Sequence, residues 1–379
     1  MTIPFNKPYL TGNEIEFIQD AVSEGHLSGN GKYTKLCHQW FEAQYGFGKC
    51  LLTSSCTDAL EMAAILLNIG EGDEVIMPSY TFVSTANAFV LRGAKIVFAD
   101  SSAHNPNIDA AAIEPLISQR TKAIVVVHYA GVACDMDAIM QLANEHNLFV
   151  VEDAAQAIDS YYLRPCGERK ALGSIGHLAA FSFHETKNIT CGEGGMLVVN
   201  EMAFAERAEI IWEKGTNRSA FFRGEVGKYG WVDIGSSFLP SELAAAFLYG
   251  QLTNLEHIQE KRRLCWQAYS DALQPLQVAG LFSLAELPEY ATNNAHMFYI
   301  ICRDIHVRST LIEYLKAKGI LVVFHYLSLH KSPYYCNKHD GRELPHADFY
   351  CERVLRLPMF VNLNPQSVIA ELVHCLESQ

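Results

Sequence analysis

The sequence predicts an α/β protein in which helices cover both faces of a mostly parallel sheet, followed by a smaller α+β domain. Through the first two-thirds of the chain, short apolar runs alternate with helical patterns, as in strands joined by crossover helices. In the last third the pattern changes to long helices with few strands. The length of 379 residues, at ~150 residues per domain, favours two or three domains.

The elements of the first part are short. Strands are expected at 73–79, 94–100, 122–128, 148–153, 177–184 and 195–200, and helices at 84–92, 108–119 and 136–146. The strand runs are apolar at consecutive positions, which is typical of strands that are buried on both faces of a sheet.

The last third is expected to contain a long helix, a strand, a second helix, a second strand and a closing helix. Their expected ranges are 241–270, 294–303, 309–318, 319–326 and 366–377. The long helix would leave the first domain and cross to the second. We therefore predict a large domain over 1–250 and a small domain over 251–379.

Composition excludes several functional classes. The 29 Lys and Arg residues against 42 Asp and Glu residues give a net charge of −13, which argues against nucleic-acid and anionic-membrane partners. No run reaches the ~18 apolar residues that span a bilayer, and the N-terminus is not that of a secretory signal. The 11 cysteines lack C-x-x-C and zinc spacing, so we expect reduced thiols, no metal and a cytoplasmic location.

A lysine follows one of the predicted strands. Lys187 lies just past the strand at 177–184 and just before the glycine-rich stretch Gly192-Glu-Gly-Gly195. Open α/β sheets bind ligands at this rim, and glycines allow the backbone to approach a bulky group. Lys187 is therefore either a loop-surface residue or a nucleophile that forms a Schiff base.

A carboxylate ends the neighbouring strand. Asp153 is the last residue of the run at 148–153, and Gln156 follows it by three positions. A strand-end aspartate either caps the next helix or pairs with a protonated ring nitrogen. Pyridoxal phosphate requires such a partner, because its pyridinium nitrogen must stay protonated for the ring to accept electrons.

Two further stretches can contact the same ligand. An apolar pair runs into Ser55, Cys56 and Thr57 before a helix, an arrangement that either caps the helix or binds phosphate. Phe82, after the strand at 73–79, belongs either to the core or to a stacking surface for an aromatic ring. Together, the four features point to pyridoxal phosphate.

The same stretches resemble the DegT-type sugar-nucleotide aminotransferases, a family of fold type I pyridoxal phosphate enzymes. The resemblance extends from residue 3 to residue 360 and is carried by Ser55-Cys-Thr57, Pro78-Ser-Tyr-Thr-Phe82, Glu152-Asp-Ala-Ala-Gln156, Ser182-Phe-His-Glu-Thr-Lys-Asn188 and Phe324-His-Tyr-Leu-Ser-Leu-His330. It implies a seven-stranded sheet in the large domain and pyridoxal 5′-phosphate as the cofactor.

The resemblance also implies roles for single residues. Lys187 would be the catalytic residue and would carry the cofactor as a Schiff base. Asp153 would pair with the pyridine nitrogen, Gln156 with the phenolic oxygen, and Phe82 would stack on the ring. The phosphate would be bound by Ser55, Cys56, Thr57 and Ser182.

The family is homodimeric, and a loop of the partner subunit reaches the phosphate. Many members place an asparagine in that loop, whereas the matching stretch here, Gly235-Ser-Ser-Phe238, has Ser237 instead. A second departure is the segment at 161–170, which is longer than in close relatives and is expected to be a surface loop.

The substrates follow from the resemblance as well. It is closest to the members that make TDP-4-amino-4,6-dideoxy-galactose for enterobacterial common antigen, through the stretches at 77–95, 127–134 and 214–219. It implies transfer of an amino group from L-glutamate to C4 of TDP-4-oxo-6-deoxy-glucose. His325 and His330 are candidate substrate-binding residues, because they lie in a motif that the family uses near the sugar nucleotide. Three further candidates rest on position and charge: His184 lies either near the cofactor or in the core, and the loop residues Arg218 and Arg223 either neutralise a diphosphate or lie in solvent.

Alternatives remain open at this point. The product could be the gluco epimer or a 3-amino sugar. Related sugar dehydratases have histidine in place of the Schiff-base lysine, so Lys187 disfavours that chemistry. A non-catalytic sugar-nucleotide-binding regulator could lose Lys187 or Asp153 freely, and both are present.

Overall fold

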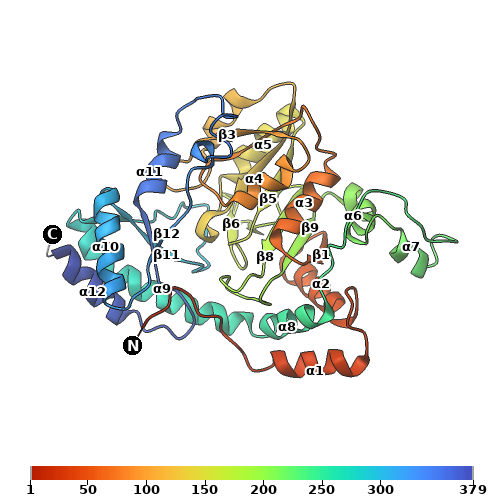
Figure 1. Ribbon diagram of the computed structural model, residues 1–379, viewed down its shortest axis with the longest axis horizontal. Coiled ribbons are helices and arrows are strands. Elements are labelled where there is room, and N and C mark those ends of the chain that lie inside the picture. Colours follow the sequence, from red (N-terminus) through yellow and green to blue (C-terminus); the bar gives the residue numbers. More distant parts are fainter. Residues whose placement is uncertain (1, 378–379) are drawn as a thin grey trace.

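The computed structural model describes residues 2–377, and its largest element is a seven-stranded sheet (Figure 1). The strand order is β1-β9-β8-β5-β4-β2-β3. The strands are β1 (Lys49–Thr53), β2 (Glu74–Pro78), β3 (Lys95–Ala99), β4 (Thr121–Val127), β5 (Phe149–Asp153), β8 (Leu178–Ser182) and β9 (Gly195–Val199). From β8 to β3 all neighbours are parallel, and β9 runs against both β8 and β1. The predicted mostly parallel sheet is confirmed.

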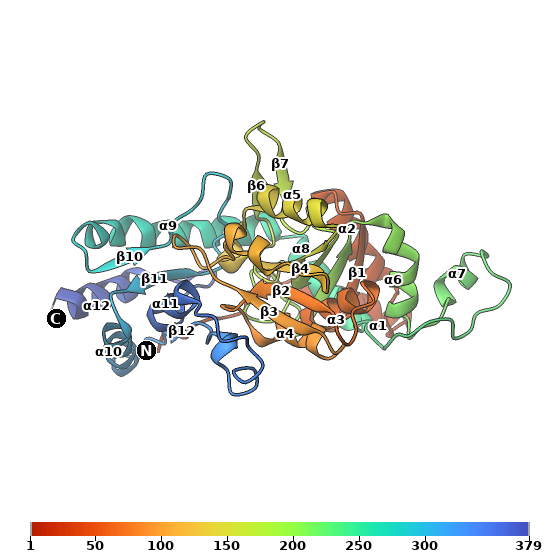
Figure 2. The same ribbon diagram turned by 90° about the horizontal axis from the view of Figure 1, so that it is seen from above.

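Helices cover both faces of this sheet, as Figure 2 shows from above. They are α1 (Glu14–Glu24), α2 (Lys32–Tyr45), α3 (Cys56–Leu66), α4 (Val83–Val90), α5 (Met136–His146), α6 (Ala205–Trp212) and α8 (Glu242–Leu252). Successive residues of β4 enter different apolar clusters: Ile124 and Val126 pack with α2, α5 and α8, while Ala123 and Val125 pack with α3, α4 and α6. This two-sided burial explains the uninterrupted apolar runs of the sequence.

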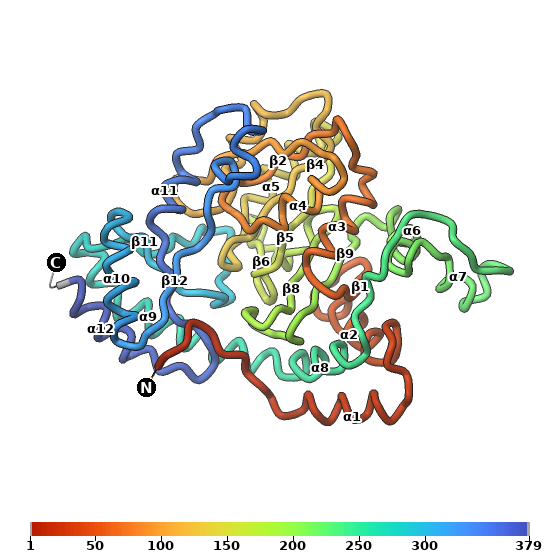
Figure 3. Tube along the Cα trace, viewed as in Figure 1, coloured from red at the N-terminus to blue at the C-terminus, as the bar shows by residue number. Residues whose placement is uncertain are grey.

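A second, antiparallel sheet lies at the end of the molecule that holds both termini (Figures 1 and 3). Its order is β10-β11-β13-β12, with β10 (Phe282–Leu284), β11 (Phe298–Cys302), β12 (Val323–Phe324) and β13 (Val354–Leu357). It packs on α9 (Leu255–Val278), α10 (Ile305–Ala317) and α12 (Gln366–Glu377) through Tyr269, Leu311 and Leu372. A further helix, α11 (Pro345–Arg353), precedes β13. The domain boundary near residue 250 stays a prediction.

Two helix predictions are wrong in detail. The helix expected at 108–119 is a pair of short 3₁₀ turns, Ala110–Ala112 and Glu114–Leu116, because Pro115 lacks the N–H that a continuing helix needs. The helix expected at 241–270 is interrupted between α8 and α9. There the side chains of Thr253 and Asn254 donate hydrogen bonds to the carbonyl of Gly250 and end α8.

Two segments project from the body of the molecule (Figures 1 and 2). The expected loop at 161–170 is a hairpin of β6 (Tyr161–Leu163) and β7 (Arg169–Ala171). The second segment, residues 214–236, is called the arm below and contains the short helix α7 (Arg218–Phe222). Bridges Glu213↔Ser237 and Thr216↔Trp231 close its base. No helix within residues 2–377 combines the length and apolar character needed to cross a bilayer.

Candidate active site

A cavity of about 580 Å³ lies where the large sheet faces the second sheet. It is lined by the ends of β5 and β8, by the first turns of α3 and α4, and by residues next to β11, β12 and β13. Ten predicted site residues lie together in its wall: Ser55, Cys56, Thr57, Phe82, Asp153, Gln156, Ser182, His184, Lys187 and His325. The volume is within the range of ~300–1,000 Å³ that is usual for small-molecule sites.

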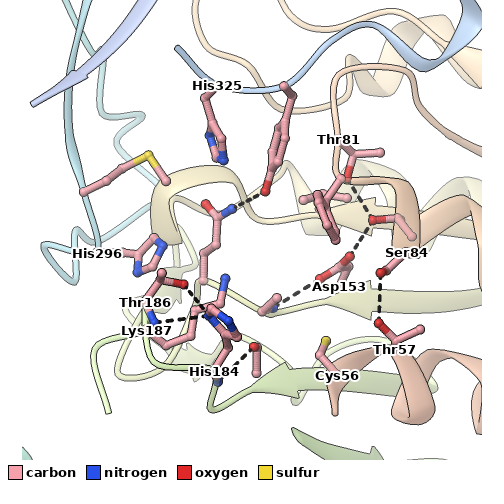
Figure 4. A pocket seen from close by; sticks show the side chains of 18 of the residues that line it. Cys56, Thr57, Thr81, Ser84, Asp153, His184, Thr186, Lys187, His296 and His325 are labelled. Carbon is pink, nitrogen blue, oxygen red and sulfur yellow. Dashed lines mark hydrogen bonds between the residues drawn. The ribbon is translucent and has the colours of Figure 1, made fainter. Parts of the chain in front are cut away.

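Lys187 extends into this cavity from the loop between β8 and β9 (Figure 4). The loop is held by backbone hydrogen bonds from Phe183 to Gly194 (2.8 Å) and from Glu185 to Gly192 (2.8 Å), and Lys187 N–H donates to the carbonyl of His184 (2.9 Å). Burial lowers the pKa of Lys187, partly opposed by the Cys56 thiol and the Asp153 carboxylate. Burial thus favours the neutral amine, which is the nucleophilic form.

Asp153 ends β5 on the same side of the sheet, and its carboxylate is only partly satisfied. One oxygen accepts a hydrogen bond from Thr85 Oγ1 (2.7 Å) and the other from Ala155 N–H (3.2 Å). Burial raises the pKa of Asp153, while these hydrogen bonds and the Lys187 charge oppose the shift. A carboxylate oxygen carries two lone pairs, so Asp153 can also accept a hydrogen bond from a protonated ring nitrogen in the cavity.

The start of α3 also lines the cavity and can bind an anion. Ser55 caps the helix by accepting a hydrogen bond from Asp58 N–H (3.1 Å). The N–H groups of Cys56 and Thr57 lie in the first turn, where a helix offers no carbonyl partner. In the strand register, Gly195 of β9 lies beside both Thr53 of β1 and Ser182 of β8. Ser182 therefore lines the cavity together with the start of α3.

Gln156 and Tyr326 join the two parts of the structure across the cavity. Gln156 Oε1 accepts a hydrogen bond from Ala130 N–H (2.6 Å), and Gln156 Nε2 donates to the Tyr326 hydroxyl (2.9 Å). His325 stacks on Tyr326 with ring centroids 3.5 Å apart, and His325 Nδ1 lies 2.8 Å from the Tyr129 hydroxyl. Burial lowers the pKa of His325, so this ring is neutral.

The aromatic and histidine predictions can also be placed. Phe82 is 54% exposed and faces the cavity, so it is available for stacking and is not a core residue. His184 Nδ1 accepts a hydrogen bond from Thr186 N–H (3.2 Å), and its ring lines the cavity (Figure 4) with Nε2 3.6 Å from Glu193 Oε1.

Four predicted residues do not line the cavity of the single chain. His330 is buried with its Nδ1 2.7 Å from Ser79 Oγ. The other three belong to the arm or its base. Arg223 pairs with Glu209 (2.9 Å) and Glu225 (2.7 Å), Arg218 lies over the Phe222 ring at 5.3 Å, and Ser237 is exposed.

The sequence reasoning missed several residues of the cavity wall, among them Thr85, His296 and Arg356. Arg356 had a visible signal, since it is the one charge in the apolar strand Val354–Leu357. His296 had none, because its place depends on how the second sheet packs. Its Nδ1 donates to Asn188 Oδ1 (2.8 Å), and burial lowers its pKa, so the ring is neutral.

These residues fit pyridoxal phosphate. The first turn of α3 suits its phosphate, the partly satisfied buried Asp153 suits its pyridinium nitrogen, and Lys187, whose pKa is lowered by burial, suits its aldehyde. Within residues 2–377 there is no cluster of three or more His, Cys, Asp or Glu side chains that could hold a metal ion.

Comparisons with known proteins agree with this geometry. A model of the DegT/DnrJ/EryC1/StrS aminotransferase family matches residues 8–376. The chain is 32% identical over 378 residues to the spore coat polysaccharide biosynthesis protein SpsC of Bacillus subtilis (strain 168), covering 97% of this chain and 94% of SpsC.

Solved structures show the same fold. The aminotransferase TlmJ from Streptoalloteichus hindustanus superimposes with a TM-score of 0.90 and 29% identity over 100% of both chains. NtdA from Bacillus subtilis, which was solved with bound cofactor PMP, gives a TM-score of 0.85 and 28% identity, covering 97% of this chain and 83% of NtdA.

Proposed function

Because the chain belongs to the DegT/DnrJ/EryC1/StrS aminotransferase family, we propose that it transfers an amino group from L-glutamate to C4 of TDP-4-oxo-6-deoxy-D-glucose. The product would be TDP-4-amino-4,6-dideoxy-D-galactose, a precursor for surface polysaccharide. At the coarser level the chain is a transaminase of the sugar aminotransferase class, and its cofactor is pyridoxal 5′-phosphate.

The observation that carries the mechanism is the placement of Lys187 and Asp153 in one cavity beside the start of α3. When bound, pyridoxal phosphate supplies a reactive aldehyde and an electron-withdrawing ring. Lys187 would hold the aldehyde and, once freed by the donor, would take the proton from the α carbon of the donor as a general base. Asp153 would keep the ring nitrogen protonated, and Gln156 would donate a hydrogen bond to the phenolic oxygen.

The phosphate of the cofactor would be held at the start of α3. The N–H groups of Cys56 and Thr57 and the Ser182 hydroxyl can donate hydrogen bonds there, and Ser55 keeps the first turn in place through its cap. Phe82 offers its exposed ring as the stacking surface. These assignments follow the family pattern at matching positions of this chain.

The choice of sugar rests on sequence resemblance and on the relatives. SpsC is named for spore coat polysaccharide biosynthesis, which favours a sugar-nucleotide substrate here too. His184 and His325 lie in the cavity wall, where they can contact the sugar. The gluco epimer and a 3-amino sugar remain the alternatives, because turning the hexose within the same pocket exposes its other face or another carbon.

We also propose that the active unit is a homodimer in which the arm of each subunit reaches the site of the other. Trp231 and Phe222 of the arm are 85% and 70% exposed, and exposed aromatic clusters of this kind are typical of protein interfaces. Ser237, Arg218 and Arg223 would then serve the neighbouring site, where an arginine suits a phosphate or diphosphate.

Product NMR tests this function directly. Wild-type protein with pyridoxal phosphate, L-glutamate and TDP-4-oxo-6-deoxy-glucose should give a 4-amino sugar whose H4 has small couplings to both H3 and H5. Large couplings to both would establish the equatorial amine of the gluco epimer. Faster conversion of the 3-oxo isomer would contradict amination at C4, and the Lys187→Ala protein is the control for non-enzymatic amination.

A further inference from the structure

A network of buried amide side chains surrounds the residue that follows Lys187. Asn188, Gln259 and Asn294 are 5%, 0% and 0% exposed, and they come from the loop between β8 and β9, from α9 and from the segment before β11. Asn188 Nδ2 donates hydrogen bonds to Gln259 Oε1 (2.8 Å) and to the carbonyl of Asn294 (2.9 Å). The other amide atom of Asn188, Oδ1, lies 2.8 Å from His296 Nδ1. The network thus joins the lysine loop to His296 in the cavity wall.

Two groups that can only accept hydrogen bonds fix the orientation of these amides. The carbonyl of Asn294 has no hydrogen to donate, so the NH2 group of Asn188 must face it. Gln259 is fixed in the same way, because its Nε2 lies 3.2 Å from a carboxylate oxygen of Asp159 and 3.3 Å from the carbonyl of Asn294. Asn188 Oδ1 therefore faces His296, and this acceptor requires the imidazole proton to be on Nδ1.

The proton on Nδ1 leaves His296 Nε2 with a lone pair, and this atom faces the cavity. Figure 4 shows the His296 ring in the cavity wall on the side of Lys187 and Thr186. Within residues 2–377 Nε2 makes no hydrogen bond and it keeps accessible surface, so its open side is the cavity. Burial lowers the pKa of His296, which keeps the lone pair free of a proton at neutral pH. Nε2 is thus available to a ligand as a hydrogen-bond acceptor.

A lone pair at this position selects among the groups that the ligands of the cavity carry. The ionised carboxylates of an amino donor, like the phosphate and phenolic oxygens of the cofactor, are acceptors themselves and are repelled by it. A hexose carries hydroxyl groups, which are neutral hydrogen-bond donors. Because Asn188 follows Lys187, the His296 ring that contacts it lies on the lysine side of the cavity, where the carbonyl of the sugar must be placed to react.

We propose that His296 Nε2 accepts a hydrogen bond from the sugar hydroxyl next to the reacting carbonyl, an inference that rests on the proposed function. In TDP-4-oxo-6-deoxy-glucose only one carbon bonded to C4 carries a hydroxyl, namely C3, because C5 carries the ring oxygen and the methyl group. The site therefore takes keto-sugars that keep this hydroxyl and disfavours those that lack it. An ether or a carbonyl at that carbon has no proton to donate and cannot replace it.

The preference for the hydroxyl is measured in the sugar half-reaction alone. Protein loaded with pyridoxamine phosphate is mixed with TDP-4-oxo-6-deoxy-glucose or with its 3-deoxy counterpart, and the gain of absorbance near ~420 nm is followed. The wild type should favour the hydroxylated sugar by at least about 10-fold in kcat/KM, the effect of leaving a buried acceptor without its partner. His296→Phe keeps a ring without a lone pair, so it should convert both sugars at similar rates and react with L-glutamate almost as the wild type does.

Two further variants separate sugar binding from a structural role. His296→Gln, whose Oε1 can accept a hydrogen bond, should keep part of the preference and keeps the test valid if the phenylalanine variant does not fold. Gln259→Leu is the control, because it removes hydrogen bonds of the same network without reaching the cavity, and the Asn294 carbonyl still orients Asn188. It should unfold at a lower urea concentration and still show the wild-type preference between the two sugars.

Nitrogen NMR of histidine-labelled protein gives a readout independent of turnover. The signals that disappear in His296→Phe belong to His296, and they should report a protonated Nδ1 and an unprotonated Nε2. A protonated Nε2, a wild type without preference between the two sugars, or a wild-type preference in His296→Phe would overturn the inference. An equal loss in both half-reactions would overturn it too, because it would place an amine common to both at Nε2. Those outcomes leave the proposed function intact, whereas a wild type that forms no amino sugar would refute the function and this inference with it.

Discussion

Two ionisable side chains in the cavity are shifted by burial toward their neutral forms. Burial lowers the pKa of Lys187 and raises that of Asp153, although each charge partly stabilises the other. Groups with perturbed pKa values in a cleft are typical of functional sites. If Lys187 and Asp153 had only a structural role, a charged pair in direct contact would be expected instead. The two residues are therefore the first to test.

Replacing Lys187 by alanine or arginine should abolish turnover. Alanine removes the nucleophile and the base, and arginine stays protonated, so we expect a loss of at least about 10⁴-fold. Turnover is measured with glutamate and the keto-sugar. Lys170→Ala, in the exposed hairpin, is the control and should retain wild-type activity. Normal catalysis by either Lys187 variant would remove the central assignment.

Asp153→Asn should keep the fold and reduce kcat by about 100-fold or more, since a neutral amide cannot hold the ring nitrogen protonated. Thr85→Val separates position from charge, because it removes the hydrogen bonds of Thr85 Oγ1 with Asp153 Oδ2 (2.7 Å) and Thr81 Oγ1 (2.9 Å) but leaves the carboxylate in place, and it should cost much less. Activity of the asparagine variant within a few-fold of wild type would assign Asp153 a structural role.

Lys187→Met should make the cofactor-free protein more stable at neutral pH by about 1 kcal/mol, because it removes a buried charge. Because the pKa of Lys187 is lowered in the folded protein, the charged amine destabilises the fold by its maximum amount at every pH below that pKa. The cost disappears as the pH rises from the lowered pKa to the ordinary value of ~10.4. Urea unfolding at several pH values measures this; a difference that grows with pH would contradict it.

At the scale of elements, the ends of the strands in the large sheet position the chemistry. The strands at 73–79, 94–100, 122–128 and 148–153 could be predicted within one residue or so, because burial on both faces makes them apolar throughout. The residues that follow β5 and β8 could be placed at the edge of the sheet for the same reason. Sequence alone failed where local signals were weak, as in the 3₁₀ turns around Pro115.

The part of the site contributed by the second sheet was harder to predict. His296 and Arg356 are far from Lys187 in sequence and reach it only through the packing of β11 and β13 against the large sheet. His330 was assigned to substrate binding from resemblance, and Arg218 and Arg223 from their charge and loop position, yet none lines the cavity of the single chain. Periodicity describes local burial, whereas these positions depend on long-range packing or on a second subunit.

The contact between β9 and α3 gives an element-scale prediction. A Cβ at Gly195 would lie 2.3 Å from the carbonyl carbon of Ser55 and 2.4 Å from the nitrogen of Cys56. Gly195→Ala should therefore displace the start of α3, destabilise the protein by about 2 kcal/mol and weaken cofactor binding. Gly70→Ala, in open space, is the control. Unchanged cofactor affinity in a destabilised Gly195→Ala protein would place the phosphate elsewhere.

At the scale of the whole molecule, the arm and the second sheet lie at opposite ends of the large sheet (Figures 1 and 2). The cavity is closed by the second sheet from within the chain, while the arm extends away from the body. An aromatic surface at such a distance from its own core gains stability only by packing against another molecule.

The last prediction concerns that arm. Trp231→Glu should convert the dimer to monomers and reduce activity, because it places a charge in the centre of the proposed interface. Val278→Glu is matched in exposure, at 81% against 85% for Trp231, but lies at the end of α9 in the other part of the molecule. This control should remain dimeric and active. Sedimentation across a range of protein concentrations, run beside the assay, measures both properties. A fully active monomer would refute the shared site and would return Ser237, Arg218 and Arg223 to ordinary surface roles.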